Sequence, residues 1–210
     1  MSPRVSITAA TDAVAAVDPV MARLRQRIGP VRLRAALATP FAALARSIVY
    51  QQLSGFAATA IHQRLVETLG GEVTPEAVLA APAERLRAAG LSAAKTLSII
   101  DLAERAVDGT IPSAARIRRM PDDEIIERLV VVRGIGRWTA EMFLIFQLRR
   151  LDVWPVDDLG VRRGYARAYD LDEWPAPRDL AALGEAFRPY RTVAAWYCWR
   201  ASEIKNPLTD

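Results

Sequence analysis

Helix-starting signals recur along the whole chain. A side chain able to cap a helix stands directly before a proline at Asp18-Pro19, Thr39-Pro40 and Thr74-Pro75. The capping oxygen accepts a hydrogen bond from an early helical amide, and the proline ring already holds the backbone angle of the first helical position. No segment alternates apolar and polar residues convincingly at the period of a strand. The sequence therefore predicts an all-α fold.

Helical spacing of apolar residues continues between these signals. It predicts one helix from Thr39 through Leu53, a second from Ser54 to the stop at Gly70-Gly71, and a third from Ser92 to Val107. Prolines divide the C-terminal part of the chain into shorter segments. The helices expected there lie near residues 158–168, 178–187 and 190–202.

The counts of reactive residues exclude several classes of protein. Cys198 is the only cysteine and His62 the only histidine among 210 residues. An internal disulfide, a four-cysteine zinc or iron–sulfur site and a multi-histidine metal centre are therefore excluded. Lys95 and Lys205 are the only lysines, against 26 arginines. Few positions can thus supply a nucleophilic amine.

Charge and hydropathy set looser limits. The net charge of +4 permits a polyanionic partner without requiring one. Charged or polar residues interrupt every apolar stretch before it could span a membrane, and residues 1–10 lack the pattern of a signal peptide. We expect a cytoplasmic protein that does not bind membranes.

A very short glycine turn separates two predicted helices in the middle of the chain. One helix runs from Pro121 to Val132, the other from Arg137 to about Leu148, and Gly134-Ile135-Gly136 joins them. Ile135 is expected to plug the helix pair from the inside. Amides at the start of a helix lack partners within it and bind anions readily. The turn is therefore either a phosphate site or a tight turn of purely structural purpose.

Two aspartates follow in Trp154-Pro155-Val156-Asp157-Asp158. A carboxylate just before a helix commonly caps it and complements its dipole. The functional alternative is a catalytic carboxylate, which stabilises positive charge developing on a sugar as its base leaves. The residue pattern alone leaves both interpretations open.

Taken together, these segments resemble the helix-hairpin-helix DNA glycosylase superfamily. The resemblance is carried by residues 134–148 (GIGRWTAEMFLIFQL) and 155–158 (PVDD), and Trp138 in particular is similar to the 3-methyladenine DNA glycosylase II branch. Residues 48–54 (IVYQQLS) resemble the family's wedge loop, and residues 191–203 resemble its last, aromatic helix. The similarity extends over about residues 15–205 and keeps the four segments in the family's order.

The resemblance implies a two-lobed, all-α architecture. Residues 41–150 are expected to form one lobe that ends in the helix-hairpin-helix. Residues 1–40 and 151–210 are expected to form the second, with the active cleft between the lobes. Asp158 would then enter the cleft from one wall and Trp138 from the other.

The resemblance also implies where DNA binds. The backbone amides expected to bind a DNA phosphate are those of Gly134, Gly136 and Thr139. A monovalent cation is expected at the backbone carbonyls of Val130, Val132 and Ile135, and no side chain is expected to bind a metal.

In the family, an apolar side chain fills the gap left when a nucleotide is flipped out of the duplex. Leu53, with Gln52 beside it, matches that wedge. Trp138 and Trp199 match aromatic walls of the base pocket, where an indole face attracts a positively charged alkylated purine. Without the resemblance, a core leucine and core tryptophans would be the simpler interpretation. Met142 and Arg200 stand where the family can have aromatic residues.

The catalytic carboxylate is assigned by the spacing that the family shows after it. Asp158, Val161 and Arg162 fit that frame, and Asp157 is expected to be a capping neighbour. In bifunctional members, a lysine that cuts the strand stands one residue after the position of Arg137. Trp138 occupies that place here.

The expected protein is a monofunctional glycosylase that hydrolyses the N-glycosidic bond of alkylated purines such as 3-methyladenine and 7-methylguanine. Its expected partner is damaged double-stranded DNA, and it is expected to act as a monomer without an iron–sulfur cluster. Three alternatives remain open. They are a non-catalytic helix-hairpin-helix DNA-binding module, a glycosylase for deaminated bases such as uracil, and an all-α protein-interaction domain.

Overall fold

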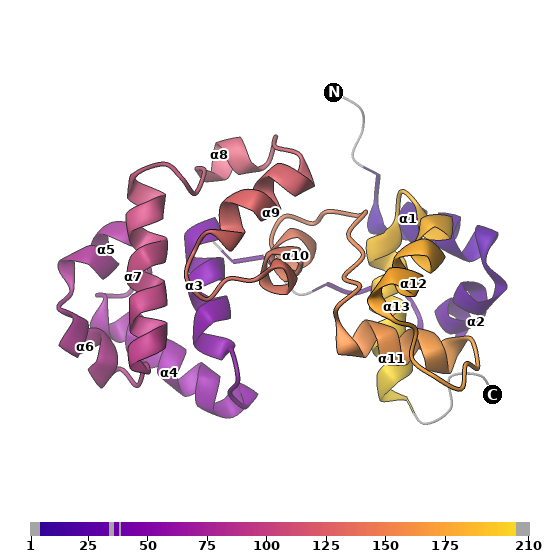
Figure 1. The fold of residues 1–210 in the computed structure, drawn as a ribbon, viewed down its shortest axis with the longest axis horizontal. Coiled ribbons are helices and arrows are strands. Elements are labelled where there is room, and N and C mark those ends of the chain that lie inside the picture. The colour runs from indigo at the N-terminus through magenta and orange to yellow at the C-terminus, as the bar shows by residue number, and fades with distance from the viewer. Residues whose placement is uncertain (1–4, 34–35, 38, 205–210) are drawn as a thin grey trace. The chain divides into compact units, whose positions relative to one another are not determined.

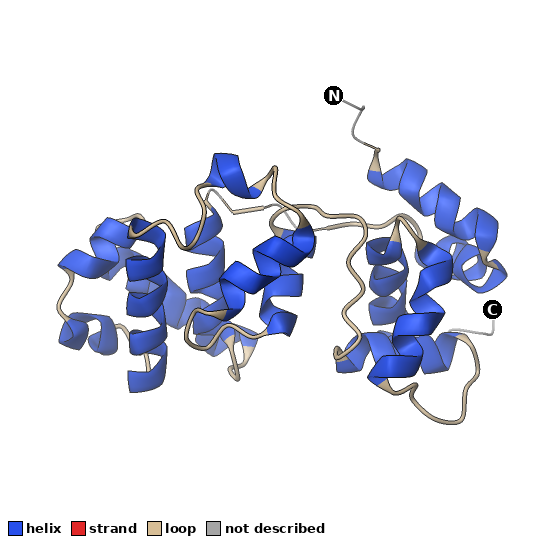
Figure 2. Cartoon of the chain, turned by 45° about the horizontal axis from the view of Figure 1, so that its top comes forward, coloured by secondary structure: helices blue, strands red, loops and turns tan. Residues whose placement is uncertain are grey.

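The computed structural model describes residues 5–33, 36–37 and 39–204 (Figure 1). Helices are the only regular elements in these ranges, and no strand occurs in them (Figure 2). The predicted all-α fold class is confirmed. None of the described helices is both long and apolar enough to cross a membrane.

The chain divides into two compact units. Unit 1 contains the described residues of Met1–Arg34 and Arg149–Asp210, and unit 2 those of Ala35–Leu148. Unit 2 is thus one continuous stretch of chain, whereas unit 1 is assembled from two stretches that are far apart in the sequence.

Unit 2 is a cluster of helices (Figure 1). Its core consists mainly of branched aliphatic side chains. α7 packs against α3 and α5, and α9 packs against α10. The helices are α3 (Pro40–Tyr50), α4 (Gly55–Thr68), α5 (Pro75–Ala80), α6 (Ala83–Ala88), α7 (Ala93–Val107), α8 (Ala114–Ile117), α9 (Asp122–Val130) and α10 (Arg137–Phe146). Fully buried core residues include Leu44, Ile48, Leu65, Leu86, Ile99, Leu102, Ile125 and Leu129.

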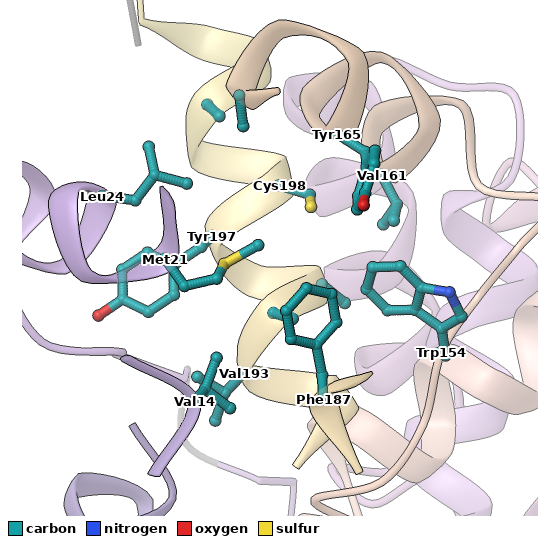
Figure 3. Packing of buried hydrophobic residues seen from close by; sticks show 14 of the residues in the cluster. Val14, Met21, Leu24, Trp154, Val161, Tyr165, Phe187, Val193, Tyr197 and Cys198 are labelled. Carbon is teal, nitrogen blue, oxygen red and sulfur yellow. The ribbon is translucent and has the colours of Figure 1, made fainter. Parts of the chain in front are cut away.

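Unit 1 holds the remaining helices: α1 (Ile7–Val17), α2 (Pro19–Ile28), α11 (Leu159–Ala168), α12 (Pro177–Leu183), the 3-10 helix η1 (Gly184–Phe187) and α13 (Arg191–Glu203). Its core joins both stretches of the chain, because Met21 and Leu24 of α2 belong to the same buried cluster as Tyr197 of α13 (Figure 3). The Tyr197 hydroxyl also donates to the Gly29 carbonyl at 3.0 Å.

Two helices of unit 1, α11 and α13, pack closely together. Gly164 of α11 sits against the backbone of Cys198, so a Cβ atom there would overlap the Cys198 carbonyl group. Cys198 is completely buried, which raises the pKa of its thiol because burial disfavours the thiolate. It lies in the apolar core of unit 1 as a small side chain on the last helix.

Local chemistry explains the starts of three helices. The side-chain oxygens of the predicted capping residues accept early helical N–H groups, at 2.8 Å for Asp18, 3.1 Å for Thr39 and 3.2 Å for Thr74. In each case proline occupies the first helical position. These three predicted helix starts are confirmed.

The predicted course of the chain is wrong between Tyr50 and Ser54. α3 ends at Tyr50 instead of continuing to Leu53, and Gln52 adopts a left-handed conformation with φ of 56°. The Ser54 side chain then caps α4 by accepting the Ala57 N–H at 3.3 Å. Leu53 has helical spacing in the sequence but lies on a loop, because the Ser54 cap starts a new helix with its own axis.

Other boundaries also differ from the sequence-based expectation. α9 begins at Asp122, with Pro121 as its capping position, and α10 ends at Phe146. The sequence analysis did not predict α1, α6 or α8. Two of these helices are only one or two turns long, so apolar spacing gives a weak signal for them.

Candidate active site

The glycine turn of unit 2 presents helix amides without a capping side chain. Gly134 takes a left-handed conformation with φ of 77°, which glycine adopts without strain. Gly136 occupies the N-cap of α10, and α10 has no side-chain cap hydrogen bond. The first amides of a helix carry partial positive charge, so this end of α10 has the chemistry of an anion site. Thr139, on the first turn of α10, is buried.

Neighbouring side chains shape the turn. Ile135 is buried between the two glycines, as expected for a side chain that plugs the hairpin. A Cβ atom at Gly134 would lie 2.8 Å from the Ser98 hydroxyl oxygen, so α7 packs directly against the turn. Arg137 is largely exposed and bonds Glu141 at 3.1 Å. The guanidinium lies beside the helix amides, and its charge is offset by the Glu141 carboxylate.

The segment expected to be a wedge lies on the surface of unit 2. Leu53 is 38% exposed and Gln52 is exposed, so an ordinary core leucine is the wrong interpretation of this position. Gln51, just before them, donates from its amide Nε2 to the Gly134 carbonyl at 2.8 Å. This bond ties the wedge loop to the glycine turn. The role of Gln51 was not predicted from the sequence, because a bond across 83 residues leaves no signal in local spacing.

Asp158 has a defined position at the start of α11 in unit 1. Its Oδ1 accepts the Val161 N–H at 2.8 Å, and so caps the helix. The same oxygen accepts the indole N–H of Trp199 at 2.8 Å. Asp158 is 8% exposed, whereas its neighbour Asp157 is exposed. The structure thus brings together two of the predicted site residues, Asp158 and Trp199.

Gly160 makes room for this contact. A Cβ atom at Gly160 would lie 2.8 Å from Cδ1 of Trp199 and 3.1 Å from Oδ1 of Asp158. Any other residue would therefore push the indole away from the carboxylate. The sequence analysis missed Gly160, although a glycine in the first turn of a helix is costly enough to be a signal.

Trp138 lies on the first turn of α10 and is 47% exposed, so it is not a core tryptophan. It belongs to unit 2, whereas Asp158 and Trp199 belong to unit 1. The expectation that these residues face one cleft stays a prediction.

The residues whose roles the sequence left open have structural partners. Trp154 is a core residue of unit 1, and its indole donates to the Leu180 carbonyl at 2.7 Å. Trp196 donates to the Arg32 carbonyl at 3.2 Å. In unit 2, Tyr50 bonds Thr59 at 2.9 Å and meets the His62 ring edge-on.

His62 has an environment that disfavours its charged form. Partial burial, together with the nearby charge of Arg46, lowers the pKa of His62 below its ordinary value. Within the described residues, no group of three or more histidine, cysteine or acidic side chains is arranged to hold a metal ion.

Residues 45–189 match the model of the HhH-GPD superfamily of base excision DNA repair proteins, and the chain belongs to that family. The membership predicted from the sequence is confirmed.

The relatives give a finer comparison. DNA-3-methyladenine glycosylase 1 of Schizosaccharomyces pombe is 37% identical over 205 residues, which cover 96% of this chain and 90% of that protein. A solved structure of the S. pombe 3-methyladenine DNA glycosylase Mag1 in complex with abasic DNA matches with a TM-score of 0.83 and 36% identity, over 96% of this chain and 99% of that one. The DNA-3-methyladenine glycosidase of Bacillus halodurans matches with a TM-score of 0.84 and 36% identity, over 94% and 92% of the two chains.

Proposed function

We propose that the protein is a DNA glycosylase of base excision repair, which binds DNA and removes alkylated purines by hydrolysing their N-glycosidic bonds. The observation that carries this proposal is the 37% identity, over 96% of the chain, to a protein named DNA-3-methyladenine glycosylase 1. The relative solved with abasic DNA supports DNA binding, because abasic DNA is the product of base removal.

Asp158 is the proposed catalytic residue. As a base leaves, positive charge develops on the sugar, and a carboxylate stabilises that charge and orients or deprotonates the attacking water. The Val161 and Trp199 N–H groups both bond its Oδ1, which fixes the orientation of the carboxylate before substrate arrives. Such preorganisation is what a transition state needs from a charged group.

Trp138 and Trp199 are the proposed aromatic walls of the base pocket. An N3- or N7-alkylated purine carries positive charge, and the face of an indole attracts it by about 0.5–2 kcal/mol. A neutral base gains little from the same contact. This difference, added to the weakened glycosidic bond of the alkylated base, would give selectivity for damage.

The glycine turn is the proposed phosphate site. It uses the backbone amides of Gly134, Gly136 and Thr139. Leu53 and Gln52 are proposed to fill the gap left by the extruded nucleotide, since both are exposed on a loop bonded to that turn.

A monovalent cation is part of this proposal. The carbonyls of Val130, Val132 and Ile135 would hold it, and it would supply positive charge toward the phosphate. The Val132 carbonyl accepts the Ile135 N–H at 3.0 Å, and a carbonyl oxygen has a second lone pair for a cation. This second lone pair on the Val132 carbonyl supports the proposed site.

The proposal includes hydrolysis without strand cleavage. Lyase chemistry requires an amine that forms a Schiff base with the sugar. Trp138 stands where bifunctional relatives of this superfamily carry that lysine, and an indole cannot form a Schiff base. The abasic strand should therefore break only after alkali or heat.

The test is release of free base from duplex DNA treated with a methylating agent. Asp158→Asn should lower the release rate by about a hundredfold or more. Asparagine keeps an oxygen that can accept the Val161 and Trp199 N–H groups and also caps helices well, so folding should change little. Asp157→Asn is the matched control, and we expect near wild-type release from it.

Two other outcomes of this test would contradict parts of the proposal. Wild-type protein that binds DNA but releases no methylated base would contradict the proposal, and a uracil-containing duplex run beside it would then detect a glycosylase for deaminated bases. Release that persists in Asp158→Asn would move the catalytic role to another residue.

A further inference from the structure

One face of α7 touches both segments that we propose to contact DNA. Lys95, Ser98 and Asp101 are spaced three residues apart, and this spacing places neighbours on the same side of a helix. Lys95 reaches the wedge loop, while Ser98 and Asp101 reach the glycine turn. All of these residues lie in unit 2.

The Lys95 ammonium group holds the end of α3. Its Nζ donates to the carbonyl of Val49 at 2.7 Å and to the carbonyl of Gln51 at 2.7 Å. The last carbonyls of a helix lack partners within it, and a cation there is stabilised by the helix dipole. The chain leaves α3 at this point and turns, through Gln52, into Leu53. Lys95 therefore fixes the base of the wedge loop.

The same helix holds the glycine turn. A carboxylate oxygen of Asp101 accepts the Arg133 backbone N–H at 2.7 Å, and Arg105 in turn bonds Asp101 at 3.0 Å. One turn earlier, the Ser98 hydroxyl lies against Gly134 and leaves no room for a side chain there. Asp101 therefore fixes Arg133 and Ser98 packs against Gly134, so α7 contacts both residues at the start of the turn.

Gln51 links the two segments directly. Its carbonyl accepts from Lys95, while its side-chain amide donates to the Gly134 carbonyl at 2.8 Å. The contacts run from α7 to the wedge loop, from the loop to the turn, and from the turn back to α7. Displacing any one link shifts Leu53 relative to the phosphate-binding amides.

We propose that Lys95 is a positioning residue for nucleotide flipping, which holds the Leu53 loop at a fixed position relative to the glycine turn so that phosphate binding and wedge insertion occur together. This inference rests on the proposed function. Two of the three N–H donors of the Lys95 ammonium group are engaged by carbonyls, so the inference assigns it a structural role and neither Schiff-base chemistry nor a phosphate contact.

The test compares base release from two duplexes under single-turnover conditions. In one, 7-methylguanine is paired with cytosine. In the other, it faces an abasic-site analogue and has no pairing partner to lose. Lys95→Met should lower the release rate about tenfold on the paired duplex and much less on the unpaired one, because only the first needs full wedge insertion. Leu53→Ala should show the same pattern.

A double-mutant cycle measures the coupling. If Lys95 acts through Leu53, the Lys95→Met/Leu53→Ala protein should be no slower than Leu53→Ala alone. Lys95→Arg, which retains a cationic donor, should recover much of the rate. Gln51→Met tests the same coupling at another contact, since it removes the hydrogen bond to the Gly134 carbonyl and leaves the Lys95 ammonium group in place. We expect the same loss on the paired duplex alone.

Arg64→Met is the matched control. Arg64 also donates to a backbone carbonyl in unit 2, that of Ala89 at 2.9 Å, and its loss removes the same charge. It should leave the ratio of the two duplex rates unchanged. A variant that is merely destabilised would lose rate on both duplexes alike and would also show a lower melting temperature.

Three results would overturn the inference. The first is an equal loss of rate on both duplexes, and the second is additive effects of Lys95→Met and Leu53→Ala. The third is a plot of log affinity for DNA against log salt concentration whose slope is shallower by about 0.9 in Lys95→Met, which would make Lys95 a direct phosphate contact. Wild-type protein that releases no base from either duplex would instead contradict the proposed function itself, so the two failures are distinguishable.

Discussion

At the scale of single residues, the Oδ1 atom of Asp158 accepts two hydrogen bonds. It caps α11 through the Val161 N–H and receives the Trp199 indole N–H. The structural and the catalytic interpretation of this aspartate are therefore compatible, because the cap is what aims the carboxylate. The same arrangement gives Trp199 a structural role besides its proposed place in the base pocket, since its ring nitrogen restrains the carboxylate directly.

Trp199→Phe separates these roles. Phenylalanine keeps an aromatic face but cannot donate a hydrogen bond, so we expect base release to fall about tenfold through loss of a bond to a charged group. Single-turnover release from methylated duplex DNA measures the effect. Trp196→Phe is the matched control on the same helix, because its indole bonds the Arg32 carbonyl instead and its loss should change release little. Equal effects of the two changes would contradict the positioning role of Trp199.

The sequence was informative about residues of this site wherever a local pattern carries the chemistry. The family's spacing, with an apolar and a basic residue after the aspartate, favours Asp158 over Asp157, and its catalytic role stays a prediction. Gly160 and Lys95 were missed for different reasons. Gly160 matters through a ring that arrives from residue 199, and Lys95 through carbonyls 44 and 46 residues away. Contacts of this range depend on the tertiary fold, about which local spacing says nothing.

At the scale of elements, the contact between α11 and α13 controls the site. Asp158 begins α11, and Trp199 lies on α13, so the distance between their axes sets the bond between them. Gly164 permits that distance, because the backbone of Cys198 occupies the space where its side chain would be. Packing in this pair of helices and chemistry at the site are thus linked by one glycine.

Gly164→Ala should destabilise the protein by about 1–3 kcal/mol or more, because the added methyl group forces two backbones apart. Thermal unfolding followed by circular dichroism measures the change. Gly55→Ala is the matched control, since Gly55 begins α4 and nothing lies within 4 Å of the Cβ position. It should be neutral or slightly stabilising for the helix. A melting temperature for Gly164→Ala equal to that of wild type would contradict this packing argument.

Helices and loops were not equally predictable at this scale. A cap such as Thr39 or Asp18 needs only residues within one turn, so the three capped starts followed from the sequence. The end of α3 did not, because Leu53 continues the apolar spacing while Lys95 and Gln51 hold the chain in a loop. The wedge loop exists through tertiary hydrogen bonds, and its helical spacing was misleading for that reason.

At the scale of the whole molecule, the two units differ in how the chain builds them. Unit 2 is continuous in sequence, but the core of unit 1 requires α1 and α2 together with helices that begin after residue 150. The N-terminal helices therefore have apolar faces that only the C-terminal part of the chain can cover. During synthesis from the N-terminus, all of unit 2 is therefore made before the C-terminal helices that complete the core of unit 1.

A chain ending at Leu148 tests this dependence. Its α2 segment should be cut by trypsin at Arg23, Arg25 and Arg27 much faster than in the full chain, because α13 is missing from its packing surface. Helices α3 to α10 should resist cleavage equally in both proteins. Mass spectrometry of timed digests measures the two rates. Equal protection of α2 in both chains would contradict the shared core.

The burial of Cys198 has a practical consequence for following unit 1. Thiol reagents react with the thiolate, and this thiol is fully buried with a raised pKa, so the folded protein should be almost inert to them. Because the sequence contains no other cysteine, each label counts one molecule in which the core of unit 1 around Cys198 has opened. The rate of labelling therefore measures how often this core, which includes the helix pair that holds Asp158 and Trp199, opens. The mass of the intact chain shows the fraction of molecules labelled.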